Sequence, residues 1–140
     1  DMNKKKIIYE IKKIKLDFFR DSRGDLSVFD FNNIPFNIKR VFSVKADKNE
    51  VRGNHAHKKC LQFMVCLNGR IKLKLDNGHK KFTKILSKPN SGILVPNNIW
   101  ASQKYLENKS VMIVFCNRKY EKDDYINDYN KFLSQKFIKY

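Results

Sequence analysis

The stretch that decides the fold is Arg52-Gly53-Asn54-His55-Ala56-His57, which continues to Gln62 and then to Gly69. It contains two of the three histidines in the chain, two positions apart. Side chains two residues apart on a β-strand project to the same face, so both imidazoles are predicted to point the same way. A glycine stands at each end of the pattern, and Asn68-Gly69 is a signal for a two-residue hairpin turn. The pattern therefore predicts a strand that carries a histidine pair on one face, followed by a hairpin.

Short β-type segments separated by turn residues extend along most of the chain. Gly, Pro, Asn and Asp stand between them, as in the turn at residues 21–25 and in a second hairpin signal, Asn77-Gly78. Short strands with frequent turns are typical of sandwiches and barrels, so we expect an all-β fold. The expected strands are residues 7–16, 26–31, 38–44, 61–67, 70–75, 80–86, 93–95 and 110–116.

Helical spacing occurs only near the C-terminus. Tyr125, Tyr129, Phe132 and Leu133 recur at i, i+4, i+7 and i+8. Acidic residues within 121–124 suit the N-terminus of a helix, where the helix dipole favours negative charge. We expect one short C-terminal helix. Because the chain shows no repeat and no linker, residues 1–140 are predicted to form a single domain.

Composition excludes several classes of protein. The chain has 30 Lys and Arg against 14 Asp and Glu, a formal net charge of +16, yet its 41% hydrophobic content is too high for a disordered basic tail. No basic run exceeds three residues and no nucleic-acid-binding motif occurs, so most lysines are expected on a solvated surface, with no nucleic acid as partner. No segment approaches the roughly 18 apolar residues of a membrane span, so no membrane association is expected.

Cysteine usage indicates the compartment. Cys60, Cys66 and Cys116 are an odd number without CxxC spacing, which argues against a disulfide framework and against a zinc knuckle. Lys4, Lys5 and Lys6 lead into a charge-interrupted segment that does not read as the apolar region of a secretory signal. We expect a reducing, cytoplasmic setting.

The histidine stretch, read as G-x-H-x-H-x4-Q-x6-G, resembles the first motif of the cupins. In cupins, a double-stranded β-helix or jelly-roll barrel holds a metal on two histidines and a glutamate. Here Gln62 stands at the carboxylate position, and the stretch Pro96–Ala101 ends in Ala101 where metal-binding members have a third histidine. Two histidines alone fall short of the usual catalytic metal sets, so we expect a cupin barrel without a metal and without a cofactor. A purely structural histidine pair is the alternative, and His79 is expected to be an ordinary surface residue.

Inward-facing histidines without a metal are suited to proton transfer, because an unperturbed imidazole has a pKa near 6.5. Arg52, three residues before His55, and Arg23 in the turn at residues 21–25 could hold an anion through their planar forks of donors. Either arginine could instead be a structural salt-bridge partner.

Beyond the histidine stretch, further segments carry a resemblance to a specific family. The chain resembles the nucleotide-linked sugar 3,4-ketoisomerases, small metal-independent cupins that act on TDP-4-keto-6-deoxyglucose, over roughly residues 17–132. The segments that carry it are Arg52–Lys58 with Gln62, Asp21–Leu26, Ile34–Phe36, Ile38–Val41, Pro96 with Trp100, and Tyr120–Tyr129.

The resemblance implies the activity and the site. The expected reaction moves a ketone from C4 to C3 of a TDP-linked 6-deoxy sugar through an enediol, a step of deoxyaminosugar and lipopolysaccharide-type glycan biosynthesis. It also implies a homodimer that exchanges N-terminal strands. Family members commonly have two tyrosines where this chain has Phe42 and Ser43, so the phenolic role is missing or has passed to a smaller hydroxyl. The expected catalytic residues are His55 and His57, with His55 slightly favoured as the base that abstracts the proton. The expected substrate- and nucleotide-binding residues are Arg52, Arg23, Gln62, Ser43, Arg40 and Trp100.

Other functions remain open at this point. A non-catalytic sugar-nucleotide-binding cupin and a metal cupin such as a dioxygenase are alternatives from other classes. A sugar 3,5-epimerase, also a metal-free cupin, acts on the same substrate. The Arg-Gly-x-His-Ala-His-Lys pattern at residues 52–58 together with Gln62 favours the ketoisomerase. The sequence leaves open whether the product has the galacto or the gluco configuration.

Overall fold

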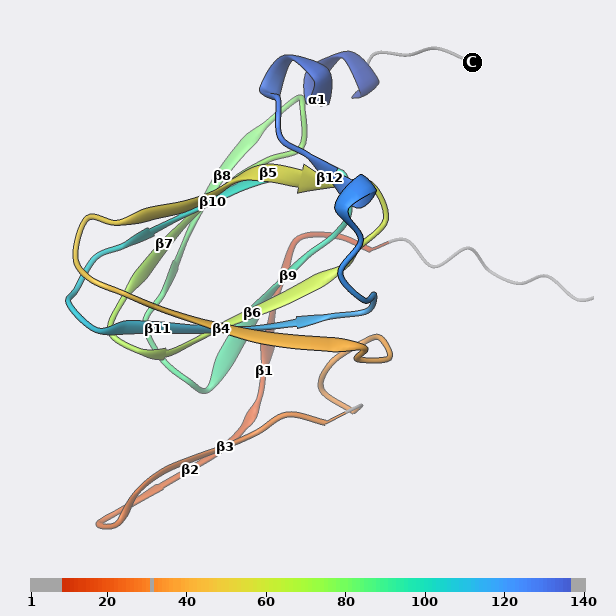
Figure 1. Ribbon diagram of the computed structural model, residues 1–140. Helices are drawn as coiled ribbons and strands as arrows, with labels where there is room; N and C mark the ends of the chain where they lie inside the picture. The colour runs from red at the N-terminus through yellow and green to blue at the C-terminus, as the bar shows by residue number, and fades with distance from the viewer. Residues whose placement is uncertain (1–8, 31, 137–140) are drawn as a thin grey trace, which may run out of the picture.

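Two five-stranded antiparallel sheets lie face to face and form a jelly-roll barrel (Figure 1). The computed structural model describes residues 9–30 and 32–136. One sheet has the order β1-β9-β6-β11-β4 and the other β12-β5-β10-β7-β8. The expectation of an all-β cupin barrel with a short C-terminal helix is confirmed. The strands are β1 (Lys12–Lys15), β2 (Asp17–Asp21), β3 (Gly24–Val28), β4 (Arg40–Ala46), β5 (Val51–His57), β6 (Gln62–Asn68), β7 (Ile71–Asp76), β8 (Lys81–Leu86), β9 (Ser91–Val95), β10 (Trp100–Tyr105), β11 (Ser110–Cys116) and β12 (Tyr125–Ile126), with a 3-10 helix at Lys122–Asp124 and helix α1 at Tyr129–Lys136.

The core lies between the two sheets and follows from the two-residue alternation of the strands. In β7, Ile71, Leu73 and Leu75 are buried while Lys72 and Lys74 face outward. Burying one such side chain contributes about 1.5–3 kcal/mol to folding. A separate small cluster on the outer face of the second sheet packs α1 against β5 and β10. The barrel interior is therefore mostly apolar, and its buried polar side chains include His57, Gln62 and Gln103.

The predicted hairpin at Asn68-Gly69 is wrong, and the one at Asn77-Gly78 is confirmed. Strand β6 pairs with β9 and β11, whereas β7 belongs to the opposite sheet, so the first turn crosses from one sheet to the other. Gly69 has φ 79°, and a Cβ there would collide with the side chain of Ser110. The second turn joins β7 and β8, which are hydrogen-bonded neighbours.

Other boundaries differ from the sequence expectation. Strand β10 was not anticipated, because its inward positions include the polar Gln103 and break the apolar alternation. Tyr125 lies in β12 and not in the helix, which begins at Tyr129. The expected strands 7–16 and 26–31 correspond to the shorter β1 and β3, and residues 7, 8 and 31 lie outside the described residues.

One hairpin stands away from the barrel. Strands β2 and β3 pair only with each other, and Figure 1 shows them projecting from the body of the molecule. Phe19 and Leu26, which face each other across this hairpin, are 60% and 59% exposed. A lone two-stranded hairpin is marginally stable in water, so we expect another surface to cover these apolar side chains.

Among the described residues, no helix is long and apolar enough to cross a membrane.

Candidate active site

The two histidines lie on the interior face of β5, as the alternation predicted. His55 is opposite Ala101 of β10, a core residue, and His57 is opposite Tyr125 of β12. The ring centroids of the two imidazoles are 5.1 Å apart, with one ring edge-on to the other. Ala56 between them points to the other face, where it packs under α1. One strand thus presents two imidazoles side by side.

A β-bulge precedes the histidines and sets which residues share their face. Along β10, Ala101 and Ser102 are consecutive, but their partners on β5 are His55 and Gly53, so Asn54 is an extra residue. Gly53 and Asn54 have φ of 90° and 59°, the left-handed conformation typical of such bulges. The extra residue shifts the alternation by one, and Arg52, opposite the buried Gln103, falls on the histidine face. The positive charge of Arg52 accordingly acts on the pKa of the buried Tyr105, although burial dominates and raises that pKa to about 12.

Asp124 fixes the orientation of His57. The Nδ1 atom of His57 lies 3.0 Å from Oδ2 of Asp124, and both side chains are only 6% exposed. The same carboxylate accepts the backbone N–H groups of Lys59 at 2.7 Å and Cys60 at 3.3 Å. A carboxylate surrounded by three donors accepts hydrogen bonds only, so Nδ1 of His57 carries the hydrogen. The Nε2 atom is then an unprotonated base, and it is buried without a hydrogen-bond partner.

The backbone around this dyad is held from two directions. The N–H of Lys58 donates to the carbonyl of Asp124 at 2.8 Å, and the N–H of Asn98 donates to the carbonyl of His57 at 2.7 Å. The side-chain amide of Asn97 donates to the carbonyl of Lys58 at 2.9 Å. The β9–β10 turn, which carries part of the resemblance noted in the sequence, therefore supports the end of β5.

An aromatic hydroxyl completes the immediate surroundings of the histidines. The ring of Tyr125 lies 5.0 Å from that of His55 and 4.4 Å from that of His57. Burial raises the pKa of the Tyr125 phenol, an effect that the nearby Arg40 partly opposes. The phenol keeps its proton at neutral pH and can donate a hydrogen bond. The ring of Tyr120 lies beside that of Tyr125, tilted by 48°, with centroids 5.6 Å apart.

Burial also governs both imidazoles. It lowers the pKa of His55 to about 4, with a smaller contribution from the neighbouring His57. The pKa of His57 is lowered as well, again chiefly by burial and against the opposing hydrogen bond with Asp124. Both rings are therefore neutral at pH 7 and available as bases, as proton abstraction requires.

Arg40 and Gln62 meet at a thiol beneath the histidines. Nη2 of Arg40 donates to Sγ of Cys116 at 3.6 Å, and Nε2 of Gln62 donates to the same sulfur at 3.8 Å. The guanidinium lies 5.8 Å from the ring centres of both Phe42 and Tyr120. Its Nε atom is buried and has no partner, so Arg40 keeps an unused donor in the site. The structure thus brings Arg40 and Gln62 to the region where the sequence expected them.

Three other expected residues lie elsewhere. Ser43 is exposed on the outward face of β4, because it is one residue away from the inward-facing Phe42. Trp100 is on the outer face of β10 and packs against Tyr129 and Phe132 of the helix segment. Arg23 sits in the projecting hairpin, paired with Asp21, and its side chain is 88% exposed. Within one chain, the structure does not bring Ser43, Trp100 or Arg23 to the histidines.

The sequence reasoning missed Asp124 and Tyr125 as site residues. Both were assigned to the start of the C-terminal helix, on account of negative charge and helical spacing. The available signal was the stretch Tyr120–Tyr129, which carried family resemblance but had no role attached to it. Its actual structure is a 3-10 turn followed by β12, which pairs with the histidine end of β5.

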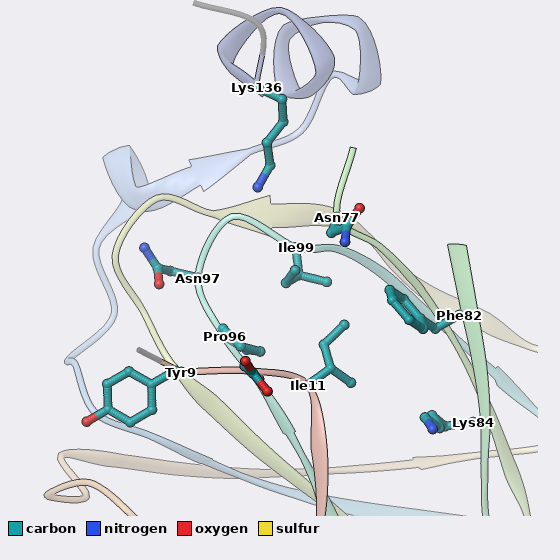
Figure 2. Close-up of a pocket in the computed structure, with 10 residues that line it drawn as sticks. Tyr9, Ile11, Asn77, Phe82, Lys84, Pro96, Asn97, Ile99 and Lys136 are labelled. Carbon is teal, nitrogen blue, oxygen red and sulfur yellow. The ribbon is translucent and has the colours of Figure 1, made fainter. Parts of the chain in front are cut away.

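A separate cavity lies away from this site. A cavity of about 790 Å³ lies by the edge strands β1 and β8, near the side chains of Ile11, Phe82 and Ile99, with Lys84 and Lys136 beside them (Figure 2). The histidine pair is on the side where β4 faces β5. The residues also do not fit a cupin metal centre, because Ala101 lies opposite His55 and Gln62 is bonded to Cys116.

A jelly-roll barrel with an inward-facing histidine pair, one of them backed by a buried carboxylate, defines a cupin with an acid–base site. Comparison with known proteins identifies the family. Residues 7–137 match the family described as FdtA: WxcM-like, C-terminal, and the chain belongs to this family. Over 125 residues it is 39% identical to the TDP-4-oxo-6-deoxy-alpha-D-glucose-3,4-oxoisomerase of Aneurinibacillus thermoaerophilus, covering 88% of this chain and 90% of that protein.

Solved structures that superpose on this chain include sugar 3,4-ketoisomerases. A 3,4-ketoisomerase from Helicobacter canadensis superposes with a TM-score of 0.84 at 30% identity, covering 90% of this chain and 96% of that one. A mutant of the 3,4-ketoisomerase QdtA from Thermoanaerobacterium thermosaccharolyticum, in complex with TDP-4-keto-6-deoxyglucose, gives 0.86 at 29% identity, covering 92% and 95%.

Proposed function

We propose that this chain is a nucleotide-sugar 3,4-ketoisomerase that converts TDP-4-keto-6-deoxy-D-glucose to the TDP-3-keto-6-deoxy sugar. The observation that carries the proposal is the free Nε2 of His57, held as an unprotonated base by the 3.0 Å contact of Nδ1 with Asp124. The activities named for the relatives support the substrate class. The product serves deoxyaminosugar and glycan biosynthesis in this proposal.

The reaction is an internal proton transfer with no net oxidation. A base removes the proton from C3, which is acidic because C4 is a carbonyl, and an enediolate forms. The O3 proton passes to O4, and protonation of C4 then leaves a hydroxyl at C4 and the carbonyl at C3. We assign proton abstraction to Nε2 of His57, although the sequence favoured His55 as the base. We assign protonation of C4 to the neighbouring His55, after it has received a proton from His57 or from solvent. Such groups contribute about 10²–10⁴-fold each.

The enediolate needs hydrogen-bond donors near its oxygens. Tyr125 supplies a phenol beside both imidazoles and keeps its proton, since burial raises its pKa. Donors aimed at a developing oxyanion are among the largest contributions to catalysis. Tyr125 can thus fill the phenolic role that Phe42 and Ser43 lack.

Positive side chains on the same side of the barrel suit the diphosphate. Arg52 is on the histidine face of β5 because of the bulge, and Arg40 has an unused donor. Planar guanidinium groups bind phosphate oxygens through paired hydrogen bonds. We assign the diphosphate to these two residues within the chain.

Arg23 fits this assignment only in a homodimer. The hairpin of β2 and β3 carries it away from the barrel and exposes Phe19 and Leu26. In the homodimer with exchanged N-terminal strands that the family resemblance implies, this hairpin would cover a partner barrel and bring Arg23 to its mouth. Size measurement by light scattering tests the dimer, and Phe19→Asp should dissociate it.

The experiment that tests the function is product NMR after incubation with TDP-4-keto-6-deoxyglucose in D2O. A 3-keto product with deuterium at C4 is expected. Binding of the substrate without any exchange would make the protein a non-catalytic cupin, and deuterium at C3 and C5 with the ketone still at C4 would make it an epimerase. We further propose that the enzyme works in a reducing cytoplasm as a single cupin domain and needs no metal, so it should keep full activity after exhaustive chelation.

A further inference from the structure

One cluster of metal-binding side chains lies behind the histidine pair. His57, Cys60 and Asp124 are all buried, and one donor atom from each lies within 4.8 Å of the others. It is the single group of this kind in residues 9–30 and 32–136. The cluster differs from a cupin metal centre, because it uses neither His55 nor the positions of Gln62 and Ala101. The proposed reaction also leaves the thiol of Cys60 without a role.

The spacing of these donors is close to what zinc requires. With bonds of about 2.0–2.3 Å in tetrahedral geometry, ligand atoms lie about 3.3–3.7 Å apart. Nδ1 of His57 and Oδ2 of Asp124 are 3.0 Å apart, and no pair exceeds 4.8 Å, so shifts of about 1 Å bring all three to bonding distance. The thiol of Cys60 donates to the carbonyl of Leu61 at 3.4 Å and also contacts the thiol of Cys116.

We infer that His57, Cys60 and Asp124 form an inhibitory binding site for a thiophilic divalent cation such as Zn²⁺. The inhibitory part rests on the proposed function. Coordination needs the lone pair of Nδ1, so the single proton of the neutral imidazole moves to Nε2. The thiol of Cys60 releases its proton to solvent as the sulfur binds. With a hydrogen on Nε2, His57 can no longer accept a proton from the sugar.

The donor set also predicts which ions bind. One imidazole, one thiolate and one carboxylate suit Zn²⁺, Co²⁺ and Cd²⁺. Mg²⁺ and Ca²⁺ prefer six or more oxygen ligands, which this cluster does not offer. The positive charge of Arg40 acts on both His57 and Cys60, so it opposes any cation whose charge is not neutralised by a thiolate. The thiol of Cys116, in contact with Cys60, is a further donor beside the cluster.

Cobalt spectroscopy on the intact, metal-depleted protein tests the site without reference to activity. Co²⁺ should give a thiolate-to-cobalt charge-transfer band and the intense visible bands of a tetrahedral site, and excess Zn²⁺ but not Mg²⁺ should remove them. Cys60→Ser should abolish the charge-transfer band. It should also weaken zinc binding, measured by calorimetry, by more than about 100-fold, because loss of a residue that only hydrogen-bonds to a metal ligand costs about 10–100-fold. Cys66→Ser is the matched control, because this buried thiol contacts the carbonyls of Asn68 and Gly69 and no member of the cluster.

The outcomes separate this site from the proposed function. Absence of the charge-transfer band, or an unchanged band and zinc affinity in Cys60→Ser, would overturn the site. Zinc that binds as described while ketoisomerase turnover continues would overturn the inhibition. A metal-free protein that never isomerises the sugar would refute the proposed function, and the cobalt spectrum would still decide the site.

Discussion

The substitution Asp124→Asn probes the base directly, because it keeps the size of the side chain and removes one acceptor. Oδ1 of Asp124 accepts the N–H of Lys59 at 2.7 Å, while Oδ2 accepts Nδ1–H of His57 at 3.0 Å. An amide has one oxygen and one NH2 group, so it cannot accept on both sides. A backbone N–H can only donate, whereas an imidazole can exchange its proton between nitrogens. The amide oxygen should therefore stay with Lys59, and its NH2 should turn to His57.

With the NH2 group facing it, His57 adopts the other tautomer. Nδ1 becomes the acceptor, the proton moves to Nε2, and the base is lost. We expect kcat to fall by about 10²–10⁴-fold, equal to about 2.7–5.4 kcal/mol of activation free energy, with little change in TDP affinity. The fold should survive with a lower Tm, since the backbone N–H of Cys60 loses its acceptor Oδ2, at a cost of about 1–3 kcal/mol.

Two measurements check the argument. Steady-state turnover gives kcat, and ¹⁵N NMR of the histidine side chains reports which nitrogen of His57 carries the proton. Asp123→Asn is the matched control, because Asp123 is the exposed neighbour of Asp124 and should have wild-type kinetics. A variant at Asp124 that turns over within about threefold of the wild type, or that keeps the proton on Nδ1, would refute the assignment of His57 as an oriented base.

Four further predictions follow from the site. His55→Asn and His57→Asn should each lower kcat by about 10²-fold or more while TDP still binds by calorimetry; near wild-type rates in both would place the base elsewhere. Because burial holds the pKa of His55 at about 4 and lowers that of His57 below the ordinary imidazole value of about 6.5, kcat/KM should be constant near neutral pH and fall only on acidification below that ordinary value. The unfolded histidines take up protons near pH 6.5, so the free energy of unfolding should also decline from about pH 6.5 to 4, and a titration showing stability that rises on acidification over this range would contradict the burial. Arg52→Lys should weaken TDP binding by losing the planar fork, whereas Arg70→Lys on an exposed turn should not; equal affinities would remove Arg52 from the diphosphate site. Gly53→Ala should lower the free energy of unfolding by about 1–3 kcal/mol in urea denaturation, since φ is 90° and a Cβ would meet a backbone carbonyl at 2.9 Å; an unchanged midpoint would show that the bulge relaxes freely.

The part of the site that could be read from the sequence depends on local alternation. His55 and His57 share a face because they are two residues apart on one strand, whatever that strand pairs with. Ala101 at a ligand position predicts a barrel without the cupin metal, because a methyl group offers no donor, and the absence of a metal stays a prediction. The same local logic correctly placed the hairpin at Asn77-Gly78, where the two strands are neighbours in one sheet.

Local patterns could not predict which residues meet where strands from distant parts of the chain pair. Asp124 is 67 positions from His57, and its charge suggested a helix end until β12 paired with β5. Ser43 and Trp100 carry plausible chemistry but face outward, since a shift of one residue on a strand changes the face.

Arg52 shows most directly why the sequence alone does not determine which side chains share a strand face. Three positions before His55, it would lie on the opposite face of a regular strand. The extra residue Asn54, which is visible only in the pairing with β10, returns Arg52 to the histidine side. The sequence by itself determined that a histidine pair projects to one face of a β-strand in an all-β barrel. The pairing of distant strands, and the bulge within it, decided which carboxylate and which arginine share that face, because register is a property of two strands together.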